Sequence, residues 1–168
     1  TVVRALARLR HCHGVMARLI IVGGESEEPD ARVTPEIGRL QAIAAAEGVA
    51  GAVTFAGRKG REALKFYYSA ADIFVTTPWY EPFGITPLEA MACGTPVIGA
   101  SVGGIKSSVR DGETGYLVPP NDPEAVAERA ALLLRHPRLR EALGRRAIAH
   151  VHARFTWEEV ARQVAALY

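Results

Sequence analysis

Residues 72–100 read DIFVTTPWYEPFGITPLEAMACGTPVIGA, a strand, a loop, a helix and a second strand in succession. Asp72–Thr76 and Pro96–Ala100 are short, mainly apolar runs, which are typical of strands covered on both faces of a sheet. Gly84–Cys93 between them has the length of a short helix, and Gly94 is placed to end it. Because strands joined through a helix run parallel, the stretch predicts an α/β protein with a parallel sheet.

The same alternation of strand and helix extends to both sides of this stretch. Further strands are expected at Leu19–Val22, Ala52–Ala56 and Gly115–Val118. Helices are expected at Thr1–Arg10, from Thr34 to Gly48, at Arg61–Ala71, from Asp122 to Arg135, from Pro137, and from the capping box Thr156–Glu159. The pattern predicts a Rossmann-like, doubly wound parallel sheet with C-terminal helices.

The composition is that of one globular domain over residues 1–168, with 49% apolar and 23% charged residues. The 20 Lys and Arg against 18 Asp and Glu leave a formal charge of +2, which argues against a nucleic-acid partner. No apolar run approaches the ~20 residues that span a bilayer, so we expect no transmembrane segment and leave a peripheral membrane contact open. The two cysteines cannot form a disulfide framework, and a cytoplasmic location fits them.

The first residues look like the middle of a helix. Val2, Leu6 and Leu9 follow helical spacing from the start, and no methionine precedes them. We therefore expect a fragment of a longer chain. The last helix carries an apolar stripe that would pack either on this domain or on a missing neighbour, formed by Trp157, Val160, Val164 and Leu167.

The loop and helix start at residues 77–90 carry the chemistry, because ligands of open parallel sheets bind at the carboxyl ends of the strands. Glu81 lies in the loop and Glu89 in the second turn of the helix that begins near Gly84, so both can face one pocket. The free N–H groups and partial positive charge of a helix start suit a diphosphate, and Thr86 can add a hydroxyl. Two carboxylates beside it are placed to bind ribose and sugar hydroxyls, as in a nucleotide diphosphate sugar.

The run from Tyr80 to Val97 strongly resembles the glutamate-x7-glutamate signature of retaining GT-B glycosyltransferases, of the group 1 type in glycosyltransferase family 4. The resemblance continues through Val102–Gly104, Asp111–Val118 and Asn121–Pro123, and it covers essentially the whole chain. It implies that the chain is the C-terminal, donor-binding domain, without the N-terminal acceptor domain and without its own first strand.

The resemblance also implies a role for each residue of the site. Glu89 would bind the donor ribose, and Glu81, the catalytic candidate, would contact the hydroxyls of the donor sugar. The other implied donor-binding residues are Gly84, Ile85 and Thr86, whose backbone N–H groups would cap the diphosphate, Leu88 beside the ribose and base, Arg58 and Lys59 in a loop framing the base, and Gly23 and Gly24 near the same nucleotide.

Two features depart from the family pattern. The family holds the diphosphate with an Arg and a Lys several residues apart after the first strand, whereas Arg58 and Lys59 are adjacent and follow a later strand. Their side chains therefore either contact phosphate or belong to a solvated loop. Lys106 stands after Gly103–Gly104, where many relatives carry an acidic residue.

The implied function is transfer of a hexose from a nucleotide diphosphate sugar to an acceptor, with retention at the anomeric carbon. UDP-glucose is the first choice of donor, no cofactor or metal is expected, and the acceptor would be held by the missing N-terminal domain. The alternative is a nucleotide-sugar-binding module with no transfer activity of its own, and we expect the isolated fragment to be inactive.

Other classes of protein fit the sequence less well. A dinucleotide dehydrogenase needs a glycine spacing that Gly23–Gly24 does not supply. Glu81 and Glu89 flank a helix start suited to a diphosphate, which argues against a glycoside hydrolase. His11, Cys12 and His13 are contiguous and so cannot readily surround one tetrahedral metal ion.

Overall fold

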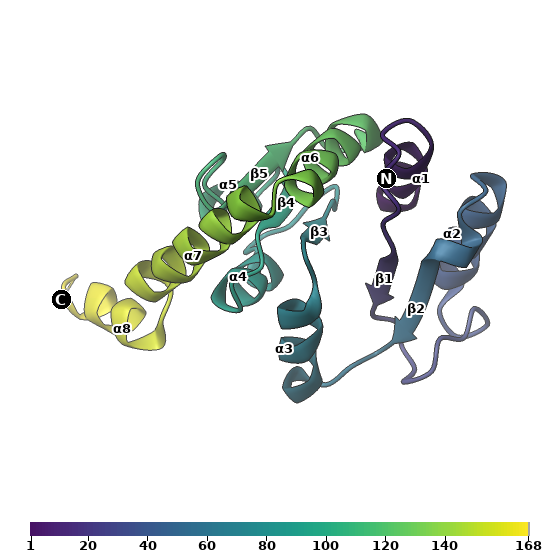
Figure 1. The fold of residues 1–168 in the computed structure, drawn as a ribbon. Helices are drawn as coiled ribbons and strands as arrows, with labels where there is room; N and C mark the ends of the chain where they lie inside the picture. The colour runs from purple at the N-terminus through teal and green to yellow at the C-terminus, as the bar shows by residue number, and fades with distance from the viewer. Residues whose placement is uncertain (168) are drawn as a thin grey trace. The chain divides into compact units, whose positions relative to one another are not determined.

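The computed structural model describes residues 1–167 as a series of alternating helices and strands (Figure 1). The chain forms two compact units. Unit one comprises Thr1–Leu64 and Asp122–Leu132, and unit two comprises Lys65–Asn121 and the chain from Leu133 onward. Two helices, α3 (Arg61–Ala70) and α6 (Pro123–Arg135), continue from one unit into the other. The expectation of a single domain over residues 1–168 stays a prediction.

Unit one is built on the parallel strands β1 (Leu19–Val22) and β2 (Val53–Gly57). Helices α1 (Val2–His11) and α2 (Pro35–Ala46) and the 3₁₀ turn η1 (Ala50–Ala52) complete it, together with the start of α6. Its core joins both helices to the sheet through the buried residues Val3, Leu6, Ala7, Ala44, Val49 and Ala52, with Leu19, Ile21 and Val53 packed against them.

Unit two is built on three parallel strands in the order β3 (Phe74–Thr76), β4 (Val97–Ala100), β5 (Gly115–Val118). The central strand β4 is buried at every residue, as expected for a strand covered on both faces. The helices of this unit are the end of α3, α4 (Ile85–Ala92), α5 (Ile105–Ser108), the end of α6, α7 (Pro137–Arg154) and α8 (Trp157–Ala165).

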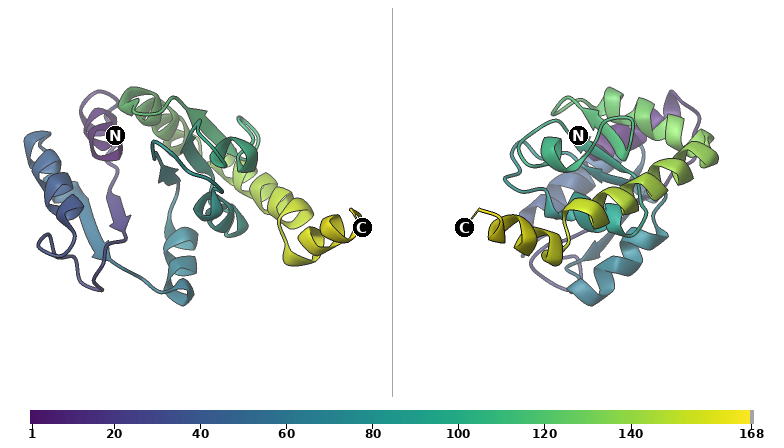
Figure 2. Two further views of the ribbon diagram at one scale, coloured as in Figure 1. Left: turned by 180° about the vertical axis from the view of Figure 1, so that it is seen from behind. Right: turned by 90° about the vertical axis from the view of Figure 1, so that its left-hand side faces the viewer.

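Helices α4 and α7 lie side by side in unit two, α4 against β3 and β4 and α7 against β5 (Figure 2). Gly144 of α7 permits this approach, because a Cβ atom there would overlap the carbonyl oxygen of Gly94 at the end of α4. Gly94 itself has φ +80°, a conformation that favours glycine at the end of a helix. The contact buries Met91 and Leu143 completely and so fixes the orientation of α4.

The predicted α/β class and the parallel strand pairing are confirmed, with element bounds within about two residues of those expected. The sequence pattern missed two short elements, η1 and α5. Within residues 1–167 the strands are described unit by unit, as β1–β2 in unit one and β3–β4–β5 in unit two.

Helix α8 begins as predicted, because the Thr156 hydroxyl oxygen accepts a hydrogen bond from the Glu159 N–H at 3.3 Å. The apolar stripe of this helix is exposed, with Trp157 at 86% and Leu167 at 82% exposure. The sequence left open whether this stripe packs on this domain or on a neighbour. Within residues 1–167 the stripe is not seen to pack on the domain. No helix in the described part of the chain has the length and apolar content needed to cross a membrane.

Candidate functional site

The loop that follows β3 is folded around the carboxylate of Glu81. Its Oε1 accepts hydrogen bonds from the N–H groups of Gly84 at 3.0 Å and Phe83 at 3.3 Å. Gly84 precedes α4 with φ +73°, a left-handed conformation that favours glycine. As predicted, Glu81 therefore lies in the loop and Glu89 in the second turn of α4. The Glu81 carboxylate already occupies one of the N–H groups predicted to cap a diphosphate.

Gly103 and Gly104, in the loop that follows β4, pack directly against the backbone of the Glu81 loop. The Gly104 N–H donates to the Glu81 carbonyl oxygen at 2.8 Å. A Cβ atom at Gly103 would overlap that same oxygen, and one at Gly104 would overlap the backbone of Phe83. Since β3 and β4 are parallel neighbours, the loops after them meet at one edge of the sheet.

In the sequence, Gly103 and Gly104 were recognised only as part of a family motif. Their close packing against the backbone of the Glu81 loop was not predicted. The available signal was two consecutive glycines that begin three residues after the end of a fully apolar strand, a pattern that indicates close approach of two backbones.

The carboxylate of Glu89 is bound by a tyrosine of α3. The Tyr68 hydroxyl donates to Glu89 Oε2 at 3.0 Å. Burial raises the pKa of Tyr68 above its ordinary value, and the hydrogen bond to Glu89 and its charge raise it further. The phenol therefore remains a protonated donor at neutral pH. The sequence predicted only the helix that carries Tyr68 and not this contact, which joins residues 21 positions apart.

The remaining predicted residues of unit two lie on the first turn and a half of α4. Ile85 and Thr86 are exposed, and Leu88 is half-buried. The first N–H groups of a helix have no partner within it, and the helix dipole adds partial positive charge there. This end of α4 can therefore bind an anion, as the sequence predicted, although the assigned roles of these residues stay predictions.

The predicted residues of unit one lie together at the carboxyl ends of β1 and β2. The Gly23 N–H donates to the Gly57 carbonyl oxygen at 2.9 Å, which joins the Gly23–Gly24 turn to the loop of Arg58 and Lys59. Lys59 Nζ donates to the Glu27 carbonyl oxygen at 3.2 Å, and Arg58 is exposed. For the side chains of Arg58 and Lys59, contact with phosphate and a place in a solvated loop both stay predictions.

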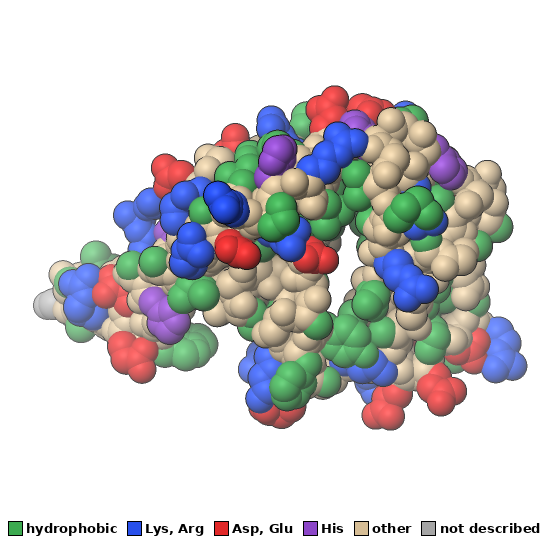
Figure 3. Space-filling model, in the orientation of Figure 1, with side chains coloured by type: hydrophobic (Ala, Val, Ile, Leu, Met, Phe, Trp, Pro, Cys, Tyr) green, Lys and Arg blue, Asp and Glu red, His purple; other side chains and the backbone are tan. Residues whose placement is uncertain are grey.

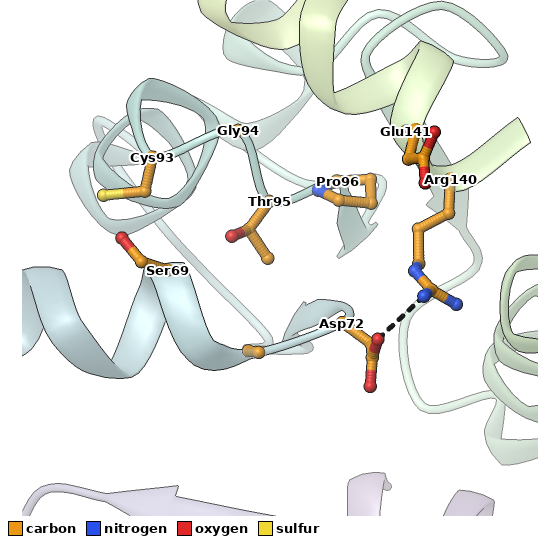
Figure 4. A pocket seen from close by; sticks show the side chains of 9 residues that line it. Ser69, Asp72, Cys93, Gly94, Thr95, Pro96, Arg140 and Glu141 are labelled. Carbon is orange, nitrogen blue, oxygen red and sulfur yellow. Dashed lines mark ion pairs between the residues drawn. The ribbon is translucent and has the colours of Figure 1, made fainter. Parts of the chain in front are cut away.

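A pocket of about 140 Å³ lies at the opposite, amino-terminal edge of the β3–β4 pair (Figure 4). An ion pair between Arg140 and Asp72 at 2.9 Å crosses it, and Cys93 and Thr95 contribute to its lining. It contains none of the predicted site residues. Its one arginine is already neutralised, so the pocket offers no unpaired charge from that side chain for a ligand.

Two further groups of polar residues lie elsewhere, and only the second of them, the run His11–His13, was considered from the sequence. Basic side chains gather over α7 (Figure 3), where Arg138, Arg145, Arg146 and Arg154 are exposed. Cys12 is exposed at the end of α1, and residues 1–167 contain no group of three or more His, Cys, Asp or Glu side chains that could hold a metal ion.

A parallel α/β domain with a paired-glutamate loop at the carboxyl ends of its strands belongs to the Rossmann-like class. The family model described as "Glycosyl transferases group 1" matches residues 1–150, which is most of the chain. The chain therefore belongs to the group 1 glycosyl transferases, and the family resemblance of the sequence is confirmed.

Known proteins of this kind resemble the chain over nearly its whole length. A D-inositol 3-phosphate glycosyltransferase of Acidothermus cellulolyticus is 41% identical over 169 residues, 99% of this chain and 36% of that protein. Sucrose-phosphate synthase from Thermosynechococcus elongatus is 36% identical with a TM-score of 0.83, covering 99% of this chain and 41% of that one. HepE of Anabaena, in complex with UDP-glucose, shares the fold at 24% identity and a TM-score of 0.81, covering 99% of this chain and 43% of that one.

The chain spans about a third of the length of the curated relatives it matches. The activity, substrates and partners of a whole protein of this kind are therefore matters of proposal for this chain.

Proposed function

We propose that the chain is the donor-binding domain of a retaining glycosyltransferase that moves a hexose from a nucleotide diphosphate sugar to an acceptor. The observation that carries this proposal is the placement of Glu81 and Glu89 on either side of the α4 N-terminus, each fixed by a defined hydrogen bond. Glu89 binds the ribose hydroxyls and Glu81 the sugar hydroxyls, while the N–H groups of Ile85 and Thr86 face the diphosphate. Gly84 and Leu88 complete the donor contacts within unit two, and the roles that the resemblance implies for Gly23, Gly24, Arg58 and Lys59 stay predictions.

In this reaction the bond between the anomeric carbon and the diphosphate oxygen breaks, and the acceptor oxygen bonds to that carbon on the same face. The acceptor proton passes to the departing phosphate oxygen, so that the step is balanced. Negative charge grows on the diphosphate as it leaves. The partial positive charge at the start of α4 stabilises this growing charge.

UDP-glucose is the proposed donor, and a phosphorylated polyol is the proposed acceptor. Support for the donor comes from HepE, whose structure contains UDP-glucose. Support for the acceptor comes from the relatives named D-inositol 3-phosphate glycosyltransferase, at 41% and 39% identity. The acceptor would be bound by a part of the longer relatives that this chain does not match.

We also propose that the protein acts in the cytoplasm without a metal or cofactor and with no nucleic-acid partner. Both cysteines are free thiols, which fits a reducing compartment. A net charge of +2 offers no basic surplus for a polyanion. Donor binding that is unchanged by a chelator would support the metal-free part of this proposal, and loss of binding would contradict it.

Calorimetric titration of the chain with UDP-, GDP- and ADP-glucose tests the proposal. We expect micromolar to millimolar binding of one donor, and Glu89→Ala to weaken it about tenfold or more, because hydrogen bonds to a carboxylate are lost. The exposed Glu158→Ala on α8 is the matched control and leaves affinity unchanged. Equal affinity of Glu89→Ala and the unaltered chain for every donor would show that the site is misplaced.

The second candidate, a binding module without transfer activity, is favoured for this chain by its length relative to its relatives. The same preparation, incubated with the preferred donor and inositol 3-phosphate, distinguishes the two. Donor binding without a glycosylated product supports the module. Measurable product formation by the chain alone would eliminate it.

A further inference from the structure

We propose that Tyr68 is a positioning residue that fixes the carboxylate of Glu89 for recognition of the donor ribose. This inference rests on the proposed function, because it takes Glu89 as the group that binds ribose. It assigns a specificity-determining role to a residue outside the glutamate-x7-glutamate motif, in a different helix.

Tyr68 is immobilised at three points within unit two. Its side chain is 8% exposed, and its ring packs edge-on against Phe74 with centroids 5.3 Å apart and an interplanar angle of 84°. Its backbone carbonyl oxygen accepts a hydrogen bond from the Thr95 hydroxyl at 2.6 Å. The third point is the hydroxyl itself, which donates to Glu89 Oε2 at 3.0 Å.

The anchors of Tyr68 and of Glu89 belong to one local framework. Thr95 lies three residues beyond the end of α4, and its own N–H donates to the Ala90 carbonyl oxygen at 3.0 Å. Ala90 directly follows Glu89 in α4. The end of α3 and the end of α4 are thus joined through Thr95, whose hydroxyl donates to Tyr68 and whose N–H donates to Ala90, and this link supports the phenol and the carboxylate together.

A glutamate on a helix surface samples several rotamers, and ordering it on binding costs conformational entropy. The hydrogen bond from a rigid phenol removes much of that freedom before the nucleotide arrives. It also fills one acceptor site of Oε2 and orients the carboxylate so that its remaining acceptor sites face the ribose hydroxyls. The consequence is selectivity for ribose over a deoxyribose that lacks a hydroxyl which Glu89 accepts.

The hydroxyl can be removed with little change to the rest of the framework. In Tyr68→Phe the ring still fills its buried site and contacts Phe74, and the backbone carbonyl still accepts from Thr95. Tyr67→Phe is the matched control, since Tyr67 is the neighbouring tyrosine of α3 and the hydroxyl that donates to Glu89 belongs to Tyr68. A melting curve for each variant verifies that it is folded.

The experiment measures the dissociation constants of UDP and of its 2′-deoxy and 3′-deoxy analogues, with the GDP and ADP series in parallel. For the unaltered chain we expect UDP to bind more tightly than at least one deoxy analogue. Glu89→Ala should bring the ratio of the dissociation constants close to one. Tyr68→Phe should reduce the ratio about three- to tenfold, with the affinity for the deoxy analogue nearly unchanged, and Tyr67→Phe should keep the full ratio.

A second variant tests the same contact without altering the tyrosine. Glu89→Gln keeps an oxygen that can accept from Tyr68 but lacks the charge, so we expect part of the discrimination to remain. Adding Tyr68→Phe to Glu89→Ala should then produce no further change in the ratio, since the group that Tyr68 positions is already absent.

Three results would overturn the inference in distinguishable ways. If Glu89→Ala abolishes ribose selectivity and Tyr68→Phe preserves it, the positioning role is wrong and the proposed function stands. If Tyr68→Phe weakens ribose and deoxyribose nucleotides equally, the hydroxyl acts only through the fold. If the unaltered chain binds none of the three diphosphates, the proposed function fails and the role of Tyr68 fails with it.

Discussion

Gly103 and Gly104 show how much of the site depends on residues that carry no functional group. Both pack against the backbone of the loop that carries Glu81, and neither position has space for a Cβ atom. The carboxylate of Glu81 is therefore placed by the absence of side chains on the neighbouring loop, as well as by its own hydrogen bonds to Phe83 and Gly84.

We predict that Gly104→Ala displaces the Glu81 loop and weakens donor binding about tenfold or more. The new methyl group would overlap the Phe83 backbone, which cannot rotate away as a side chain could. Such overpacking typically costs about 1–3 kcal/mol of folding stability. Titration with the preferred nucleotide sugar and a melting curve measure the two effects.

Gly51→Ala is the control for this substitution, because a Cβ atom there meets nothing within 4 Å. It should leave both affinity and melting temperature nearly unchanged. A Gly104→Ala variant that binds the donor as tightly as the Gly51→Ala variant would mean that the Glu81 loop does not depend on the close approach of Gly104 to the Phe83 backbone.

At the scale of elements, the short helix α5 was missed from the sequence although it packs at the site. It has only four residues, too few for a periodic apolar pattern to be recognised. Its position is fixed by tertiary contacts: a Cβ atom at Gly84 would lie 3.0 Å from Ser108 Oγ and 3.1 Å from the Ile105 nitrogen. By contrast, the strand–loop–helix unit from β3 to α4 was predictable, because its apolar runs, glycines and prolines are local signals.

Helix α7 also supports α5, through a buried histidine. His150 is 9% exposed, and its Nε2 lies 3.1 Å from the Ser108 carbonyl oxygen. Burial lowers the pKa of His150 below its ordinary value of 6.5, and the cations Arg110 and Arg154 lower it further, while the Ser108 carbonyl and Glu113 oppose this.

We predict that unit two loses stability as the pH falls below about 6.5 because of His150. The unfolded chain, with the ordinary pKa, takes up a proton at a higher pH than the folded chain does. The free energy of unfolding attributable to His150 is therefore constant above this pH, decreases as the pH falls, and levels off below the lowered pKa of the folded state.

Urea denaturation at about pH 7, 6 and 5 measures this dependence, and variants of the histidine isolate its share. His150→Gln, whose amide can still donate to Ser108, should show a smaller loss of stability over this range. His152→Gln on the exposed side of the same helix should behave like the unaltered chain. An identical slope for the two variants would exclude His150 as the cause.

At the scale of the whole molecule, the class of fold and the placement of Glu81 in a loop and Glu89 in a helix could be predicted, but the distribution of burial could not. The strands β1 and β4 are almost equally apolar in sequence. In the structure β4 is buried throughout as the middle strand of three, whereas β1 has one partner, β2, in its two-stranded sheet. Which apolar strand becomes central depends on pairing between strands far apart in the sequence. The pattern of residues within one strand does not determine that pairing.

An isoleucine at the second position of each strand permits a direct test of this difference. Ile98 in β4 is fully buried, and Ile20 in β1 is 56% exposed because Leu19 and Ile21 take the face that packs on the core. We predict that Ile98→Ala lowers the free energy of unfolding by about 2–5 kcal/mol, through lost burial and the cavity left behind. Ile20→Ala should lower it by less than about 1 kcal/mol, since most of that side chain already contacts water. Denaturant titration of the two variants measures both values, and equal losses would show that the exposure of Ile20 does not lower the cost of truncating it.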